Sequence, residues 1–154
     1  MRGAAAGVRF DEQGEVVSMR VVIVWGPPAS GKTTYVRKHM TVGDLVVDLD
    51  LIKQAISMAG KTEAGDNLLP TALRIREMLY QLVARREVGC DTAWIVASLP
   101  RRAEREELKL RLRAELVQMR ASMQECISRA LADPERLDKE LQARIIERWF
   151  SQYE

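Results

Sequence analysis

A chain of 154 residues has room for one compact domain, and its 47% apolar and 30% charged residues are typical of a soluble globular protein. The net charge of +2 excludes a field that would draw the whole molecule to nucleic acid or to a membrane, although it allows a local basic groove. The sequence has neither an apolar run of membrane-spanning length nor a signal-type apolar segment, so we expect a cytoplasmic protein without membrane association. The spacing of Cys90 and Cys126 fits neither a metal site nor a redox motif, which favours two buried thiols in a reducing cytosol.

Residues 1–18 differ from the rest of the chain, and we expect residues 19–154 to form the domain. Short apolar runs, Val8–Phe10 and Glu15–Val17, flank a polar turn and suggest a small hairpin. The slightly favoured alternative is a non-native extension, with Met19 as a second start, and we assign no function to it.

The first core strand runs directly into the most informative stretch of the sequence. An unbroken apolar run, Val21–Trp25, is typical of a central parallel strand. The residues that follow it, Gly26-Pro27-Pro28-Ala29-Ser30-Gly31-Lys32-Thr33, fit G-x-x-x-x-G-K-[ST], the phosphate-binding loop called Walker A. A helix is predicted to begin at Lys32, so its N-terminus and the glycine-rich backbone attract an anion. The alternative is a strand-to-helix turn with an idle lysine.

Each position of this motif suggests a part in nucleotide binding. Lys32 supplies a positive charge for the β- and γ-phosphates and is a candidate catalytic residue, while the Thr33 hydroxyl can hold Mg²⁺. We count residues 26–33 and the adjacent Thr34 as the nucleotide-binding set.

A second strand, Leu45–Asp48, leads into a helix that starts within Asp48–Ile56. Asp50 fits a helix N-cap, which is a purely structural explanation for it. The functional alternative follows from topology, because ligands of doubly wound sheets lie at the carboxyl ends of the strands. Asp50 is then the candidate base for an alcohol acceptor, and Asp48 is a second candidate for the substrate site or a Mg²⁺ ligand. Lys53, one turn later, can contact an anionic acceptor.

The remaining elements predict the fold class. Residues 60–69 have the composition of a mobile loop, and Pro70 suits the first turn of the next helix. Further elements are a strand at Ala93–Ser98, a charged helix at Arg101–Leu112 and a strand at Ala114–Met119. A helix at Ser122–Ala132 follows, with Met123, Ile127 and Leu131 at core spacing. The last helix runs from Pro134 to about Phe150, and its predicted inward face is Leu137, Leu141, Ile145, Ile146 and Trp149. The alternation predicts an α/β P-loop NTPase sandwich whose mostly parallel sheet of four to five strands is flanked by helices.

The helix after the third strand begins with three arginines on the crevice side. Arg101, Arg102 and Arg105 could bind backbone phosphates of a nucleic acid. The neighbouring glutamates favour a salt-bridged surface helix instead. Arg101 stays a candidate substrate-binding residue.

Three segments of residues 19–56, Met19–Thr34, Val47–Asp50 and Ile52–Ile56, resemble the P-loop kinase domain of phage-type polynucleotide 5′-kinases. They are also similar to small AAA family ATPase proteins of phages and prophages, and the resemblance is looser over residues 90–154. It implies that Asp50 is the base for a 5′-hydroxyl and that Lys53 meets the acceptor's phosphate. It also implies a lid near the C-terminus whose arginines contact the ATP phosphates, with Arg129 as the best match and Arg136 as the next.

The sequence departs from these kinases in two respects. The third strand ends in Ala97-Ser98-Leu99, where the kinases carry an aspartate, so Mg²⁺ must rely on Thr33, water and Asp48. The lid is also short, and its arginine spacing matches poorly.

We therefore expect a P-loop kinase that uses ATP and Mg²⁺ to phosphorylate a hydroxyl, either a nucleic-acid 5′-hydroxyl or a small alcohol. The alternatives are an ATPase or nucleotide-gated binding module of a phage DNA-processing assembly, and a nucleotide-binding scaffold without turnover. No obligate protein partner is evident from the sequence.

Overall fold

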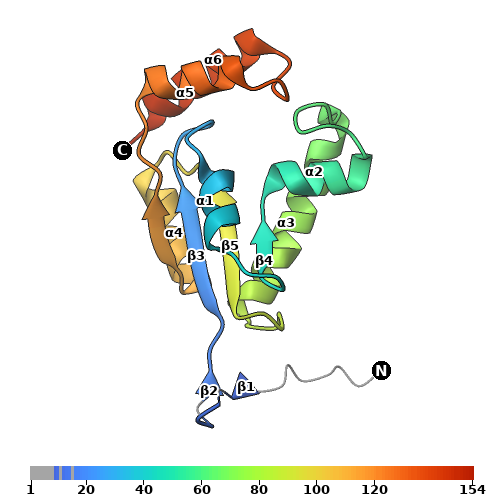
Figure 1. Cartoon of the computed structure of the whole chain (residues 1–154), viewed down its shortest axis with the longest axis vertical. Helices are drawn as coiled ribbons and strands as arrows, with labels where there is room; N and C mark the ends of the chain where they lie inside the picture. The colour runs from blue at the N-terminus through green and yellow to red at the C-terminus, as the bar shows by residue number, and fades with distance from the viewer. Residues whose placement is uncertain (1–8, 11, 15) are drawn as a thin grey trace.

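The main sheet is built from four parallel strands, and the computed structural model that shows it describes residues 9, 10, 12–14 and 16–154. The strands are β3 (Arg20–Trp25), β4 (Leu45–Val47), β5 (Thr92–Ala97) and β6 (Glu115–Gln118), in the order β4-β5-β3-β6 (Figure 1). The central strands β3 and β5 are buried on both faces, which explains their continuous apolar sequences. The predicted α/β sandwich with a parallel sheet is therefore confirmed.

Helices cover both faces of this sheet. Val21 and Ile23 of β3 lie in a core with residues of α3 (Leu69–Ala84) and α4 (Arg102–Leu112). Val22 and Val24 point to the other face, where they pack with Val36 of α1 (Lys32–His39). The chain reaches α3 from β4 through α2 (Leu49–Ser57) and the short 3₁₀ helix η1 (Asp66–Leu68).

All four strands end at the same edge of the sheet. Trp25 pairs with Ala97 and Gln118, and Val47 pairs with Ile95. The segments that follow the strands therefore meet at this edge, as expected for parallel α/β proteins.

Two further helices lie across this edge (Figure 1). α5 (Met123–Ala132) and α6 (Lys139–Gln152) pack on each other through Cys126, Ala130 and Ile146. We refer to residues 123–152 as the lid. It lies over the end of the sheet at which the phosphate loop and α2 begin (Figure 1).

The last helix begins later than the sequence predicts. Asp133 is the C-cap of α5, residues 134–138 connect the two helices, and the Asp138 carboxylate caps α6 by accepting from the Leu141 N–H. Ile146 and Trp149 are buried as predicted. The inward positions predicted for Leu137, Leu141 and Ile145 are wrong, because these side chains are 62%, 41% and 40% exposed.

Two apolar residues of α5 also lie outside the core. Met123 and Leu131 are exposed although their spacing predicts burial, whereas Ile127 of the same set packs against the lid core. The reason is that α5 and α6 bury only the narrow faces that they share.

Arg105 of α4 is buried, unlike the surface position or nucleic-acid contact that the sequence suggests. Its guanidinium donates to the carbonyl oxygens of Leu99 (3.0 Å) and Pro100 (2.9 Å) and to that of Glu154. It also lies over the Trp25 ring, 4.1 Å from its centroid. Arg105 therefore links the residues that follow β5 to the C-terminal residues through its hydrogen bonds.

The N-terminal residues form the predicted hairpin where they are described. β1 (Arg9–Phe10) pairs antiparallel with β2 (Val16–Val17). Residues 1–8, 11 and 15, which include the rest of the predicted hairpin, lie outside the described residues. That residues 1–18 are a non-native extension stays a prediction.

Two expectations drawn from the composition can be compared with the structure: the state of the cysteines, and whether a helix could span a membrane. Cys90 and Cys126 are free and buried. Within the described ranges, every helix is too short or too polar to cross a membrane.

Candidate active site

The loop between β3 and α1 has a backbone that only glycine allows at its two ends. Gly26 and Gly31 have φ angles of 152° and 93°, and a Cβ atom on Gly26 would lie 2.7 Å from the Met119 carbonyl oxygen. α1 then begins with no side-chain cap and no acidic residue in its first turn. Its first N–H groups are therefore available to an anion.

Lys32 is a partly buried cation at the centre of this loop. Its Nζ donates to the carbonyl oxygens of Gly26 (2.9 Å) and Pro27 (2.7 Å), which leaves one of its three donors. Burial lowers the pKa of Lys32 to about 8, Asp48 counteracts this shift, and Arg136 adds to it. The Ser30 hydroxyl of the same loop is buried and has no hydrogen-bond partner among the described residues. A desolvated ammonium and an unpartnered hydroxyl fit a loop that binds phosphate groups.

The lowered pKa of Lys32 predicts that nucleotide binding depends on pH. Below pH 8 the free lysine is charged, so binding of ATP takes up no proton there. Above pH 8 the free lysine is neutral, and bound phosphates, whose own pKa is about 6, favour the ammonium form. We expect proton uptake at pH 9 and an affinity that falls by up to about tenfold per pH unit. Calorimetry in buffers of different ionisation enthalpy measures the uptake, which the Lys32→Met variant should lack.

Asp48 and Asp50 have different roles in the structure, although the sequence alone could not tell them apart. Asp48 is the N-cap of α2, since its Oδ1 accepts from the Asp50 N–H at 2.9 Å. The N-cap role considered for Asp50 is therefore wrong, because the strand ends at Val47 and places the cap two residues earlier. Burial raises the pKa of Asp48, and the charge of Asp50 raises it further.

The Asp50 carboxylate is thus not used to hold the helix. Asp50 is exposed and lines the cavity over the phosphate loop, and its carboxylate makes no hydrogen bond or ion pair with the described residues. Asp50 lines the same cavity as Lys32, and its negative charge counteracts the lowering of the Lys32 pKa. This arrangement leaves the carboxylate free to accept a proton from a ligand.

Oxygen ligands for Mg²⁺ are present beside the loop. The Thr33 and Asp48 side chains line the same cavity, and hydroxyl and carboxylate oxygens are donors that Mg²⁺ accepts. Among the described residues, no three His, Cys, Asp or Glu side chains gather into a metal site. The residues therefore fit a Mg²⁺ ion that is held in part by phosphate oxygens and water.

The lid brings two arginines to the phosphate loop. Arg129 donates from Nη1 to the Ser30 carbonyl oxygen at 3.1 Å. Arg136 donates to Asp133 and, from Nη1, to Gln142 Oε1 at 2.6 Å. Both line the cavity, so the structure places these two sequence candidates together with Lys32 and Asp50.

Two other sequence candidates differ in position. Lys53 of α2 lines the cavity beside Asp50. Arg101 is exposed at the start of α4 and does not line the cavity. Of the nucleotide-binding set, residues 28–34 line the cavity, whereas Gly26 and Pro27 meet Lys32 through their carbonyl oxygens.

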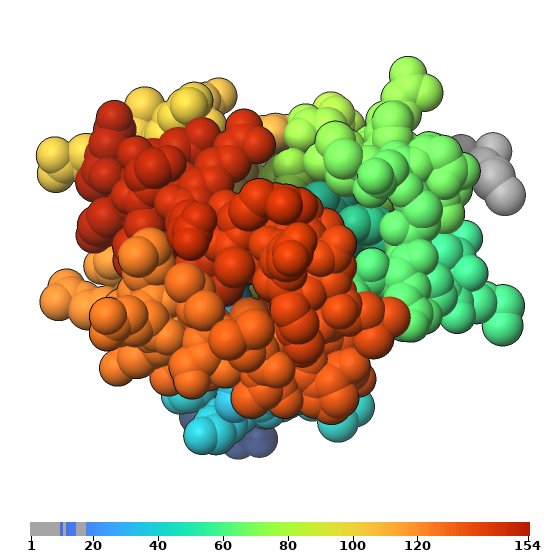
Figure 2. Space-filling view, turned by 90° about the horizontal axis from the view of Figure 1, so that it is seen from above, coloured from blue at the N-terminus to red at the C-terminus, as the bar shows by residue number. Residues whose placement is uncertain are grey.

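These residues surround one cavity of about 1550 Å³. Seen from above, the lid (orange to red) extends toward the segment between α2 and α3 (green), and the surface is hollowed between them (Figure 2). Leu137, Leu141 and Ile145 line the cavity, which explains why this apolar row of the lid is unburied. The cavity is large enough for a nucleotide together with a second substrate.

Several residues that line the cavity were not among the site residues predicted from the sequence. Arg76 and Tyr80 of α3 line the cavity, with the guanidinium 5.5 Å from the centroid of the Tyr80 ring. Their spacing of four residues puts them on one helix face, but the sequence does not tell which face meets the cavity. Asp133 and Gln142 of the lid were missed as well: Gln142 carries no charge, and the Lys61 partner of Asp133 is distant in the sequence.

Comparisons with known proteins agree with the fold that holds this site. A family described as an AAA domain matches residues 21–148. A chain of the Pnkp1/Rnl/Hen1 RNA repair complex aligns with a TM-score of 0.61 and 13% identity over 94% of this chain and 49% of that chain, so this chain spans about half of its length. Shikimate kinase from Acinetobacter baumannii, solved with shikimate, aligns with a TM-score of 0.53 and 18% identity over 88% and 78% of the two chains. No curated protein matches. The likeness to these structures establishes a P-loop kinase fold.

Proposed function

The chain belongs to the AAA domain family, and from this premise we propose that it is an ATP-dependent phosphotransferase that moves the γ-phosphate of ATP to a hydroxyl acceptor. The observation that carries the proposal is the free Asp50 carboxylate, which lines the same cavity as the Lys32 ammonium. A protein that only binds nucleotide needs the loop but no carboxylate opposite it.

The chemistry follows from the charges around the cavity. The acceptor oxygen bonds to the γ-phosphorus while the bond to the bridging oxygen of ADP breaks, and Asp50 takes the hydroxyl proton. Lys32 neutralises charge on the phosphate oxygens, and Arg129 and Arg136 supply further positive charge from the lid. Mg²⁺, bound beside Thr33 and Asp48, would supply additional charge neutralisation on the β- and γ-phosphates.

We further propose that the acceptor is the 5′-hydroxyl of a nucleic acid. Two observations support this choice: the resemblance of residues 19–56 to polynucleotide 5′-kinases, and the fold shared with a chain of an RNA repair complex. Lys53 lies beside Asp50 in the cavity, where it can pair with a phosphate of the acceptor.

Transfer of labelled phosphate tests the proposal. The protein is incubated with Mg²⁺, γ-labelled ATP and an oligonucleotide with a free 5′-hydroxyl, and the matched control is the same oligonucleotide with a 5′-phosphate. We expect label only on the first. Label on small alcohols but not on oligonucleotides would keep the kinase and reject this acceptor. Release of inorganic phosphate without label on any acceptor would favour the ATPase alternative.

A further inference from the structure

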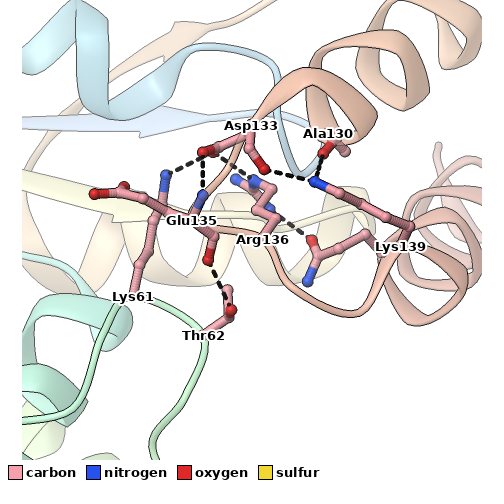
Figure 3. A network of polar contacts seen from close by, with 8 residues as sticks. Lys61, Thr62, Ala130, Asp133, Glu135, Arg136 and Lys139 are labelled. Atoms are coloured by element: carbon pink, nitrogen blue, oxygen red, sulfur yellow. Dashed lines mark hydrogen bonds and ion pairs between the residues drawn. The ribbon is translucent and has the colours of Figure 1, made fainter.

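A polar network joins the lid to the loop that follows α2 (Figure 3). We call residues 58–65, between α2 and η1, the acceptor loop. Lys61 of this loop forms an ion pair with Asp133 of the lid, with Nζ 3.4 Å from Oδ2. The Thr62 hydroxyl donates to the Glu135 carbonyl oxygen at 2.9 Å. The residues in these contacts line the same cavity as Asp50 and Lys53.

Asp133 is shared between two cations. Its Oδ2 accepts from Arg136 Nε at 3.3 Å as well as from Lys61, while its Oδ1 accepts from the Glu135 N–H at 2.9 Å. Hydrogen bonds between charged groups normally measure about 2.7–2.9 Å, so neither cation is held at the best distance. Arg136 and Lys61 therefore compete for one oxygen.

Arg136 is also the cation that a bound nucleotide would attract. It lines the same cavity as Lys32 and the rest of the phosphate loop, and its positive charge contributes to the lowered pKa of Lys32. The side chains of Lys61, Asp133 and Arg136 are 28%, 24% and 16% exposed, so water screens their charges less than those of a surface pair.

We propose that Asp133 is a positioning residue that couples nucleotide binding to closure of the acceptor loop. Bound phosphates draw Arg136 away from Asp133, and the released Oδ2 then binds Lys61 more tightly. The acceptor loop thereby becomes ordered over the acceptor only when the nucleotide is in place. The acceptor side of this proposal rests on the proposed function, whereas the coupling between the loop and the nucleotide does not.

Coupling of this kind is reciprocal and has a measurable size. If nucleotide binding strengthens closure of the loop by some factor, closure strengthens nucleotide binding by the same factor, which in proteins is commonly about 5- to 150-fold. Substitution of Lys61 removes the ion pair with Asp133 while leaving Lys32, Asp50 and Arg136 in place. It should therefore change the response to nucleotide rather than the chemical step.

Hydrogen exchange of the full chain tests the coupling without turnover. A non-hydrolysable β,γ-imido analogue of ATP with Mg²⁺ should slow amide exchange in residues 58–65 of the wild type by about fivefold or more. Lys61→Met should lose this slowing, Lys61→Arg should keep most of it, and Asp133→Asn combined with Lys61→Met should behave as Lys61→Met alone. Arg20→Met is the matched control, because it breaks a similar Arg20–Glu115 ion pair that does not line the cavity.

Kinetics give a second readout. In Lys61→Met the KM for a 5′-hydroxyl oligonucleotide should rise about fivefold with little change in kcat, because the reacting groups are untouched. The proposal is overturned if the analogue slows exchange in residues 58–65 equally in Lys61→Met and wild type, or slows it in neither. Lack of phosphate transfer combined with the expected exchange pattern would instead reject the proposed function and keep the coupling.

Discussion

Replacement of Lys32 by alanine should lower the rate of phosphate transfer by about 10³-fold or more. The Lys32 ammonium is positioned by two carbonyl oxygens of the phosphate loop and is partly withdrawn from water. Alanine would leave the β- and γ-phosphates without this charge in a place where solvent replaces it poorly. Single-turnover transfer of labelled phosphate measures the chemical step, and calorimetry should show weaker ATP binding.

An exposed lysine outside the cavity provides the control for this variant. Lys109 of α4 does not line the cavity, so Lys109→Ala should transfer phosphate at the wild-type rate. If Lys32→Ala kept wild-type transfer and ATP affinity, the loop between β3 and α1 would not be the nucleotide site.

The parts of the fold that the sequence predicted are those determined by contiguous patterns. Val21–Trp25 is apolar without interruption, and the structure buries it as the central strand β3. The lid was predicted less well, because its helices bury only the faces that they share. The spacing indicates that Leu141 and Ile146 are both apolar positions of α6. It does not indicate that Leu141 lines a cavity while Ile146 packs against α5.

The candidate site likewise has parts that could be predicted from the sequence and parts that could not. The phosphate loop is a contiguous motif, so its residues and the position of Lys32 could be read directly. The roles of Asp48 and Asp50 depend on the residue at which β4 ends and α2 begins. If that boundary lay two residues later, Asp50 would cap the helix in place of Asp48. Arg105 follows Arg101 by one turn, yet it is buried under the C-terminal residues, because those residues return to the end of β5.

The contact between Lys61 and Asp133 could not be predicted from the sequence for a further reason. The two residues are 72 positions apart, and each stands in a polar segment whose charges have many candidate partners. A pattern in one sequence cannot select among such partners, since surface ion pairs add little stability and need no particular spacing. Only the arrangement of the lid over the sheet brings this pair together.

Asp50→Asn should lower phosphate transfer by about 10²- to 10⁴-fold while ATP affinity stays within about twofold of wild type. Asparagine has nearly the volume of aspartate, and the Asp50 backbone N–H still donates to Asp48, so the start of α2 is preserved. What the variant loses is a group that can accept the hydroxyl proton. Labelled transfer to a 5′-hydroxyl oligonucleotide gives kcat and KM, and calorimetry gives the ATP affinity.

The way in which the loss divides between kcat and binding decides the role of Asp50. A fall confined to kcat assigns proton removal to this carboxylate, because neither substrate binds less tightly. Weaker ATP binding with unchanged kcat would place Asp50 with the nucleotide or its metal ion instead. Glu106→Gln, at an exposed carboxylate of α4 outside the cavity, should change neither quantity. Full transfer by Asp50→Asn would show that the acceptor loses its proton to solvent or to Asp48, and the carboxylate opposite the phosphate loop would then have no part in the chemistry.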